Sequence, residues 1–431
     1  MSDATPPSVP GSPSPSAGEA RDQAEMDWQR LSYLTLVWGQ FKKNRLALFG
    51  LYAVLFLIVL AVYAPFLSCN QPLYFHYQGQ ASFPFWRGLF NRLLYENAVD
   101  ILFNLALVLS PLYALGYFIA SKVLGARFFR LRLRLLGGFL ASYFFVYALM
   151  LPERFFSFEN PLYHQEKVTN YTTLALALDA QKEPYSAWFP PLRYGYRDTD
   201  PTRNVEPPSA QHWLGTDTEG RDVFARMLYG TRISLTIGVV AVSIYVGIGL
   251  LLGALAGYFG GWADMLISRL IEVMICFPSF FLILTIAALI ERRSIFHVMI
   301  IIGVTSWTGV ARLIRAEFLK HRSLEYAQAA LALGIPRFRI IFRHILPNAI
   351  APVLVSATFG VASAILVESS LAFLGIGDLS VASWGETLNA GRLEQKLWLI
   401  LAPGFAIFFV VSVFNLVGEG LRDALDPKLK T

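Results

Sequence analysis

The chain has 431 residues, of which 55% are hydrophobic and 15% are charged, and its formal net charge is +6 at pH 7. Several stretches exceed the roughly 18 apolar residues that mark a membrane-spanning helix. This composition excludes a soluble enzyme and predicts an all-α, polytopic membrane protein. Many of the basic residues lie in loops beside the apolar stretches, where they indicate orientation and contact with anionic lipid rather than nucleic acid.

The N-terminal part of the chain divides into two segments. Residues 1–27 are rich in Pro, Ser, Gly and Ala, so we expect them to be disordered. Residues 28–67 combine an amphipathic segment with a first span at about 46–67. The basic cluster Lys42–Arg45 directly precedes this span, which predicts a cytoplasmic N-terminus.

Residues 68–211 are predicted to be an extracytoplasmic region that contains an inserted two-helix membrane hairpin at about 98–151. Two apolar runs, at about 99–121 and 135–151, flank an arginine-rich loop. The second run is short and begins with basic residues, so a hairpin on the membrane surface is the alternative. The segment 152–230 is polar and lacks a helical period, which predicts a soluble piece outside the membrane.

Residues 212–431 form the predicted core. It has five apolar spans, so that the protein has about six core spans plus the inserted pair. A glycine-rich turn at 257–264 joins the first two core spans, and Pro278 predicts a kink in the second. The five spans lie at about 233–258, 270–290, 296–310, 350–374 and 397–417.

Three polar residues in the core spans are candidates for a translocation pathway. Glu272, Glu368 and Asn415 all lie in apolar stretches, where polar groups are costly unless they face water or a partner. For Glu368 the alternative is that it extends to the outer membrane surface. Glu272 would be the best candidate for a relay in a proton-driven carrier.

The cysteines and histidines predict neither a disulfide framework nor a metal site. Cys69 and Cys276 lie far apart and in different contexts. His212 has no second histidine or cysteine at ligand spacing. Asp217 and Asp222 do not make a catalytic pair, and we expect them to cap helices and form turns. The sequence therefore predicts no catalytic and no metal-binding residues.

A basic stretch at about 312–348 separates two apolar segments and is therefore predicted to lie in the cytoplasm. Its periodicity favours two short helices. Gly334 supplies a helix-ending turn, and Pro336 opens the second helix. The alternative is a solvated loop, because charge runs are usually exposed.

The residues of this stretch resemble the cytoplasmic signature of ABC-importer permeases, in which an Ala-Ala pair, a glycine and a later Leu-Pro form the coupling helices. The match is to the dipeptide/oligopeptide variant of the signature. Gln328 stands where that variant has an acidic residue, and Glu325 lies upstream on the same helix face. The ATPase-coupling residues implied are Glu325, Tyr326, Gln328, Ala329, Ala330, Gly334, Leu346 and Pro347.

Other strings resemble the C-type permeases of the same family. The string 212–235 is similar to the start of their core domain, and the segments 74–84 and 188–208 look like the oligopeptide/microcin C branch. The strings at 368–377 and 383–388 imply a re-entrant periplasmic segment. In it, Trp384 and Gly385 would face the binding protein.

The resemblance implies a type I ABC importer permease fold and a subunit that moves di- or oligopeptides, or peptide-like compounds, across the bacterial inner membrane by alternating access. Both termini would be cytoplasmic. The chain lacks the Gly-x-x-x-x-Gly-Lys-Ser/Thr loop that cradles phosphates, so it binds no cofactor itself. ATP and Mg would be used by two ABC ATPase subunits or domains. The other partners implied are a second homologous permease, a periplasmic peptide-binding protein and membrane lipid.

Three other functions remain open from the sequence. A proton-driven carrier requires a relay of buried ionisable groups. A membrane enzyme requires a cluster of catalytic side chains, which the six scattered histidines do not indicate. A scaffolding protein would need no polar groups along a pathway.

Overall fold

The computed structural model describes residues 33–124, 137–148 and 169–425, apart from residues 92, 292 and 379. The predicted disorder of residues 1–27 and the cytoplasmic C-terminal tail concern residues outside these ranges. Of the predicted amphipathic segment, the described part forms helix α2 (Tyr33–Phe41).

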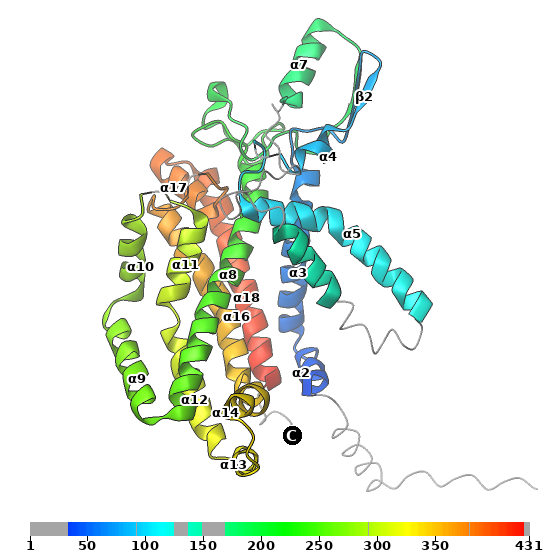
Figure 1. Ribbon diagram of the computed structural model, residues 1–431. Helices are drawn as coiled ribbons and strands as arrows, with labels where there is room; N and C mark the ends of the chain where they lie inside the picture. Colours follow the sequence, from blue (N-terminus) through cyan, green and yellow to red (C-terminus); the bar gives the residue numbers. More distant parts are fainter. Residues whose placement is uncertain are drawn as a thin grey trace, which may run out of the picture.

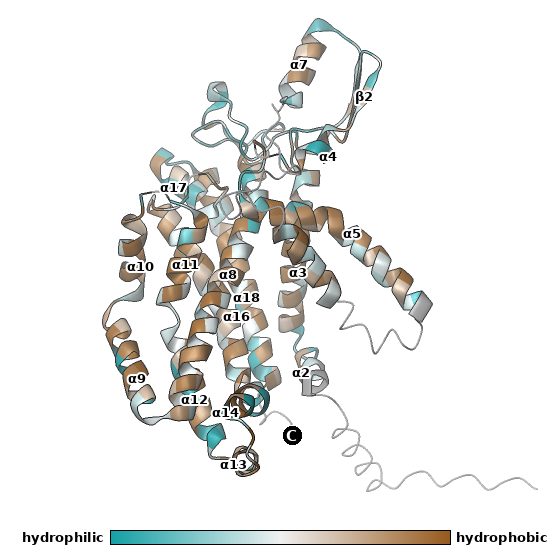
Figure 2. Cartoon of the chain, in the orientation of Figure 1, coloured by the Kyte–Doolittle hydropathy of each residue, from teal (hydrophilic) through white to brown (hydrophobic). Residues whose placement is uncertain are grey.

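Six helical stretches in the described residues are long and apolar enough to cross a membrane, and a bent helix pair makes up to seven. This confirms the predicted helical membrane architecture. Figure 2 shows apolar residues along the bundle and polar residues gathered at its two ends. The stretches are α3 (Arg45–Leu67), α5 (Ala98–Leu124), α8 (Val223–Phe259), α11 (Ile295–Thr305) continued by α12 (Thr308–Arg322), α16 (Ala351–Phe373) and α18 (Leu397–Leu425).

Helix α8 is the axis of the bundle, because α3, α11, α12 and α16 all pack against it. The helix has 37 residues and begins well before the span predicted to start at 233. Its start is fixed by Asp222, whose side chain accepts a hydrogen bond from the Ala225 N–H at 2.8 Å. The prediction that the polar piece continues to residue 230 was therefore wrong, and the capping role of Asp222 is confirmed.

The second core span is broken rather than kinked. Helices α9 (Gly261–Cys276) and α10 (Ser279–Ala288) meet at an angle of 80°. Phe277 is extended because a residue before proline is disfavoured in the helical region, and Pro278 has no N–H to continue the helix. At the other end of α9, the turn after Phe259 confirms the predicted glycine-rich connection.

The inserted hairpin consists of α5 and the helix Gly137–Ala148. The two limbs contact each other, since the Tyr143 hydroxyl donates to the Leu102 carbonyl at 2.6 Å and the Tyr147 hydroxyl to the Ala98 carbonyl at 3.0 Å. The described part of the second limb is about 18 Å long at the helical rise per residue. The rest of the predicted run at 135–151 lies outside the described residues, so the membrane hairpin and its alternative, a hairpin on the membrane surface, both stay predictions.

A small sheet lies beyond one end of the bundle, above α3 in Figure 1. Its order is β2-β1-β3, with antiparallel pairing that places Tyr74 opposite Trp188. The fold is mostly helical, as predicted, with this small sheet in addition. The prediction that residues 152–230 lack a helix was wrong, because they contain helix α7. The elements here are β1 (Tyr74–Tyr77), β2 (Gln80–Ser82), β3 (Tyr185–Trp188), α4 (Pro84–Gly88), α7 (Tyr171–Gln181), the 3-10 turn η1 (Pro201–Arg203) and α17 (Trp384–Glu394).

Candidate functional site

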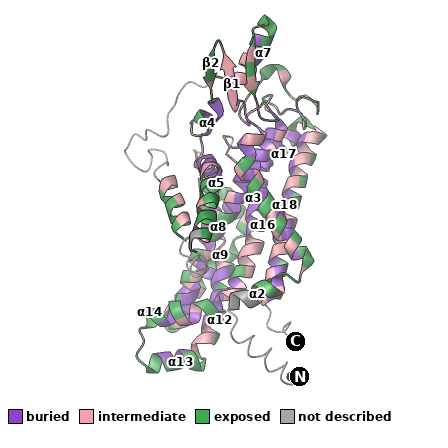
Figure 3. Ribbon diagram, turned by 90° about the vertical axis from the view of Figure 1, so that its right-hand side faces the viewer, coloured by how far each residue is buried: buried purple, intermediate pink, exposed green. Residues whose placement is uncertain are grey.

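The end of the bundle opposite the sheet carries a projection formed by residues 323–349, which we call the lever segment (Figures 1 and 3). Its first helix, α13 (Glu325–Ala332), ends in the predicted turn. The Gly334 N–H donates to the Leu331 carbonyl at 3.0 Å and the Ile335 N–H to the Ala330 carbonyl at 3.1 Å. Gly334 has a φ of +72°, a conformation that favours glycine. The helix-ending role of Gly334 is confirmed.

The rest of the lever segment is less regular than the predicted second helix. It contains α14 (Arg337–Arg339), a π-helical stretch η2 (Ile340–Ile345) and α15 (Leu346–Ala349). Pro347 in α15 has no N–H to donate, which disfavours an uninterrupted α-helix. The first part of the predicted basic stretch, residues 312–322, belongs instead to α12.

Most predicted coupling residues are exposed, but two are not. Ala330 is 5% exposed and packs into the hydrophobic core, and Leu346 is half-buried. Ala330 is therefore a packing residue, whose small side chain lets α13 lie close to its neighbours. The exposed residues are Glu325, Tyr326, Gln328, Ala329, Gly334 and Pro347.

Large apolar side chains on the lever segment are also exposed. Leu333 is 80% exposed and Phe338 is 72% exposed, and they flank the turn at Gly334. Sequence analysis missed them because they lie outside the matched signature. The sequence did contain a signal for them, because an apolar residue stands on each side of the Gly-x-Pro turn within an otherwise basic stretch. Apolar side chains projecting this far are typical of a protein interface.

One hydrogen bond attaches the lever segment to α12, and two further contacts attach α12 to α8 and α9, which argues against a slack solvated loop. The Gln328 amide donates to the Arg322 carbonyl at 2.8 Å. The Arg322 guanidinium in turn donates to the Tyr258 carbonyl at the end of α8, at 3.1 Å. In addition, Arg315 on α12 forms a two-pronged ion pair with Asp264 at the start of α9, with Nη2 and Oδ2 2.8 Å apart. The lever segment is thus connected through α12 to both α8 and the broken span.

The predicted pathway residues lie apart and in different environments. Glu272 is exposed on α9 and pairs with Arg269 one turn away, so it is not the buried carboxylate that a proton relay needs. Asn415 is half-buried on α18. Glu368 is 2% exposed and accepts a hydrogen bond from the Ser383 hydroxyl at 2.7 Å. The alternative that Glu368 extends to the outer membrane surface was wrong, since its buried side chain joins α16 to the start of α17.

Trp384 and Gly385 do not form a surface for a binding protein. Trp384 is 2% exposed, and its indole N–H donates to the Met227 carbonyl on α8 at 3.0 Å. A Cβ atom on Gly385 would lie 2.4 Å from the Ser369 carbonyl oxygen, so only glycine permits this approach of α17 to α16. The prediction was wrong because both residues are used to pack α17 against the bundle.

Beside α17 lies a buried charge network that sequence analysis did not identify as one unit. Asp217 forms the expected turn by accepting hydrogen bonds from the Glu219 and Arg221 N–H groups at 2.9 Å. It also pairs with Arg221 and Arg226, and both arginines contact Glu386 on α17. The network joins segments that are far apart in sequence, which explains why spacing gave no signal.

His212 lies just before the turn that Asp217 forms, and its ring contacts a carboxylate of the same chain. Its Nδ1 lies 2.8 Å from Oδ2 of Asp222, the cap of α8. Among the described residues, no group of three or more His, Cys, Asp and Glu side chains is arranged to hold a metal ion. His212 therefore orients the start of α8.

Comparisons with known proteins agree with the signature in the lever segment. Residues 249–431 match the family described as binding-protein-dependent transport system inner membrane component, and residues 32–83 match the N-terminal TM domain of oligopeptide transport permease C. The chain is 44% identical over 239 residues to a dipeptide transport system permease protein, DppC, of Alkalihalophilus pseudofirmus, which covers 55% of this chain and 78% of the relative. The chain belongs to this permease family.

Two other relatives support the same assignment. An oligopeptide transport system permease protein, OppC, of Haemophilus influenzae is 40% identical, with coverage of 56% of this chain and 78% of the relative. A glutathione transport system permease protein, GsiD, of Pectobacterium atrosepticum is 41% identical, covering 55% and 78%. A solved MetNI methionine ABC transporter chain aligns with a TM-score of 0.39 at 15% identity, covering 47% of this chain and 97% of that chain. The family match and the permease relatives identify this permease as an inner-membrane transport component and not an enzyme.

Proposed function

We propose that this permease moves di- or oligopeptides, or peptide-like compounds, across the inner membrane in an ATP-driven importer. The relatives named above are transport proteins for dipeptides, oligopeptides and glutathione, which supports a peptide-like cargo. The narrower placement in the oligopeptide/microcin C branch rests on residues 74–84 and 188–208. In the structure, β1 and β2 from the first segment pair with each other, and β3 pairs with β1 and ends at Trp188, where the second segment begins.

The observation that carries the proposal is the lever segment. It projects from the bundle and exposes Leu333 and Phe338. Gln328 bonds it to α12, which in turn is held to α8 by Arg322 and to α9 by Arg315. The importer would contain two ATPase subunits or domains, each with a cleft on its surface. The lever segment of this chain would dock into the cleft of one of them. Closure of the ATPases would move the lever segment, and α12 would pass that motion to the broken span as rigid-body rocking.

The proposal includes the remaining partners and the orientation. ATP and Mg act in the ATPase subunits, a second homologous permease completes the pore, and a periplasmic peptide-binding protein delivers cargo at the end that carries the sheet. The lever segment and both termini lie in the cytoplasm, consistent with the basic residues of α12 and α14. Glu272, Glu368 and Asn415 remain candidates for the pathway, although the burial of Glu368 does not favour that role.

Labelling tests the orientation directly. A single cysteine replaces Glu325 in a chain that also carries Cys69→Ala and Cys276→Ser, because both native cysteines are free thiols. In intact spheroplasts, a membrane-impermeant maleimide should leave this cysteine unlabelled, and permeabilisation should expose it. A cysteine at Trp188, which is 70% exposed at the opposite end, is the matched control and should label without permeabilisation. Labelling of the Glu325→Cys chain in intact spheroplasts would refute a cytoplasmic lever segment.

A transport assay tests the mechanism. Uptake of a radiolabelled peptide should require co-expressed ATPase subunits and should persist when an uncoupler removes the proton gradient. Uptake that collapses with the uncoupler, or that proceeds without ATPase subunits, would favour a proton-driven carrier instead.

A further inference from the structure

Helix α9 exposes a pair of opposite charges on an otherwise apolar surface. Arg269 and Glu272 lie one turn apart and form an ion pair, and their side chains are 73% and 59% exposed. The buried side of α9 carries Ile267 and Ile271, which pack into the hydrophobic core. The charged pair therefore points away from the other helices of this chain. Its exposed apolar neighbours on α9 are Met265, Leu266, Leu270 and Val273.

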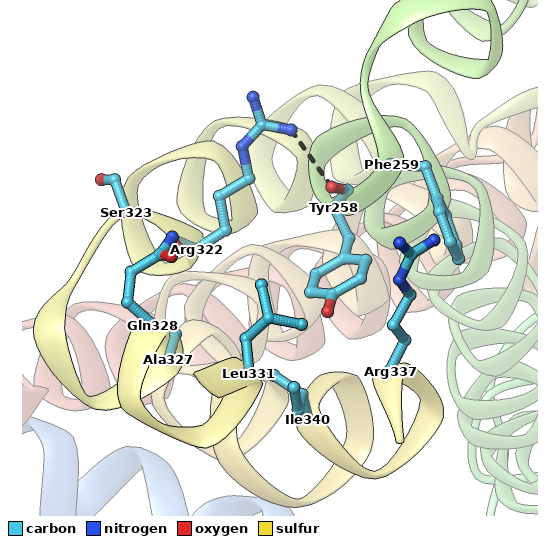
Figure 4. A pocket seen from close by; sticks show the side chains of 9 residues that line it. All are labelled: Tyr258, Phe259, Arg322, Ser323, Ala327, Gln328, Leu331, Arg337 and Ile340. Carbon is cyan, nitrogen blue, oxygen red and sulfur yellow. Dashed lines mark hydrogen bonds between the residues drawn. The ribbon is translucent and has the colours of Figure 1, made fainter. Parts of the chain in front are cut away.

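The start of α9 is fixed at the end of the bundle that carries the lever segment. Figure 4 shows Arg322 of α12 bonded to the Tyr258 carbonyl, just before the turn into α9. After that turn, Arg315 of α12 pairs with Asp264. Trp262 lies between these two anchored residues in the sequence and is 73% exposed, which is typical of a residue at the membrane–water interface. The turn therefore marks one surface of the membrane.

The charged pair lies deep in the membrane relative to this turn. At the helical rise per residue, Arg269 is about 12 Å and Glu272 about 17 Å from Gly261, the first residue of α9, along the helix axis. A bilayer core is about 30 Å thick, so both residues lie near its middle. The short side chain of a glutamate cannot reach the interface from there. Charged groups at this depth are costly in lipid and are found where they face water or a protein partner.

The break between α9 and α10 is a second indication that lipid does not cover this face. Pro278 has no N–H, so the Met274 carbonyl lacks its helical partner. Phe277 and Pro278 are both exposed in this chain. Non-helical backbone at membrane depth is tolerated only where protein covers it or where it lines a water-filled cavity. The exposed Cys276 lies four residues beyond the glutamate of the pair, on the same helix face, and connects the pair to the break.

We propose that this face of α9 lines a water-filled passage for the cargo, and that Arg269 and Glu272 bind charged groups of the passing peptide. The pair is neutral as a whole, and each member can exchange its partner. Arg269 can bind a carboxylate of the peptide, and Glu272 can bind an ammonium or guanidinium group. A peptide of either charge then meets an opposite charge in the passage. The inference rests on the proposed function, to which it adds Arg269 and the class of group that the pair binds.

The native thiol of Cys276 tests whether this face meets water. A positively charged methanethiosulfonate reagent modifies thiols in water and is excluded from lipid. In the full complex in lipid nanodiscs, Cys276 should be modified in the nucleotide-free state or with a non-hydrolysable ATP analogue, as measured by mass spectrometry. Cys276→Ser leaves only the buried Cys69 and should show no modification. An unreactive Cys276 in both states would overturn the inference, because lipid or a partner protein would then cover this face.

Charge variants test the binding of cargo. Uptake of the peptides Ala-Lys-Ala and Ala-Glu-Ala would be measured with the same binding protein throughout, so that its own preference cancels. Glu272→Gln leaves Arg269 unpaired and should lower the ratio of Ala-Lys-Ala uptake to Ala-Glu-Ala uptake about fivefold, the effect of one exposed charge contact. Arg269→Gln should raise this ratio by a similar factor. Exchanging the two residues, with Arg269→Glu and Glu272→Arg together, should return the ratio to that of wild type.

A second ion pair of the same spacing provides the matched control. Glu317 and Lys320 pair on α12, outside the proposed passage, so Glu317→Gln should leave the uptake ratio unchanged. An equal loss of both peptides in the Arg269 and Glu272 variants would assign the pair a structural role and overturn the inference. Uptake of Ala-Ala-Ala by the wild-type complex tests the proposed function separately. If Ala-Ala-Ala is taken up but the ratios do not change, only the inference about this pair fails.

Discussion

Arg232 and Asp100 form an ion pair inside the bundle, with Nη1 and Oδ1 3.0 Å apart and both side chains buried. Arg232 also donates to the Ala61 carbonyl at 2.7 Å, and the Tyr196 hydroxyl donates to Asp100 at 2.8 Å. The pair therefore joins α5, the first limb of the inserted hairpin, to α8 and α3. The hairpin is fixed to the core by charge as well as by apolar contact.

Replacing Asp100 with alanine should destabilise the protein severely. Arg232 would keep a buried charge without its partner, which costs about 3–5 kcal/mol. We expect a large fall in the detergent-solubilised melting temperature, measured by fluorescence-detected size exclusion after heating. Glu96→Ala is the control, since it removes the exposed Arg197–Glu96 pair and should cost at most about 1 kcal/mol. A similar, small effect of both changes would mean that Asp100 and Arg232 do not interact as described.

Substitution at Gly334 should uncouple transport from ATP hydrolysis. The φ of +72° there is accessible to alanine at a cost of about 1 kcal/mol but is much less accessible to a β-branched residue. Gly334→Val should therefore abolish peptide-stimulated ATP hydrolysis in the assembled complex, and Gly334→Ala should reduce it partially. No other atom lies within 4 Å of a Cβ at this position, so a steric clash cannot explain the difference. Wild-type coupling in Gly334→Val would contradict the role of the lever segment.

Gln328 should not tolerate the acidic residue that the family signature carries. Its amide donates to the Arg322 carbonyl at the end of α12, and a carboxylate there could neither donate nor complement the negative end of the helix dipole. Gln328→Glu should lower stability by about 1 kcal/mol, measured as a fall in melting temperature. Gln328→Ala removes the donor without adding charge and should have a smaller effect. The opposite order would show that the charge itself is accommodated.

Asp198 should make the region beside the sheet more stable on acidification. Burial raises the pKa of Asp198 to about 6, above its unfolded value of about 3.9. The folded protein therefore binds the proton more tightly, and stability from this group is present below pH 4 and lost as the pH rises through about 6. Wild type should gain about 1 kcal/mol over Asp198→Asn between pH 7 and pH 5.

Asp200 provides a control that does not titrate between pH 7 and pH 5. A hydrogen bond from Thr202 lowers the pKa of Asp200, so its contribution to stability is lost only as the pH falls below its unfolded pKa of about 3.9. Between pH 7 and pH 5, wild type should therefore gain melting temperature relative to Asp198→Asn but not relative to Asp200→Asn. A pH-independent difference between wild type and Asp198→Asn would contradict the raised pKa.

The sequence was most informative where the chemistry is local. Apolar runs identified the spans, and the glycine at 334 identified a helix end because one residue determines that conformation. The start of α8 was missed because the first turns contain polar residues, such as Arg226, that are buried by partners far away in sequence. Trp384 was assigned to the surface for the same reason: nothing in the local sequence shows that Met227 accepts its N–H. The Arg232–Asp100 pair likewise depends on tertiary contact alone.

Helix α8 extends about 56 Å from its cap to its final residue, given its 37 residues and the helical rise. One uninterrupted helix therefore reaches from the charge network of Asp217 and Arg226 at one surface to the Tyr258 carbonyl, which accepts from Arg322, at the other. A tilt of this helix changes the outer and inner surfaces together. Under the proposed function, movement of this one helix would link the delivery of cargo at the outer surface to the ATPase subunits at the inner surface. No relay of side chains through the interior would be required.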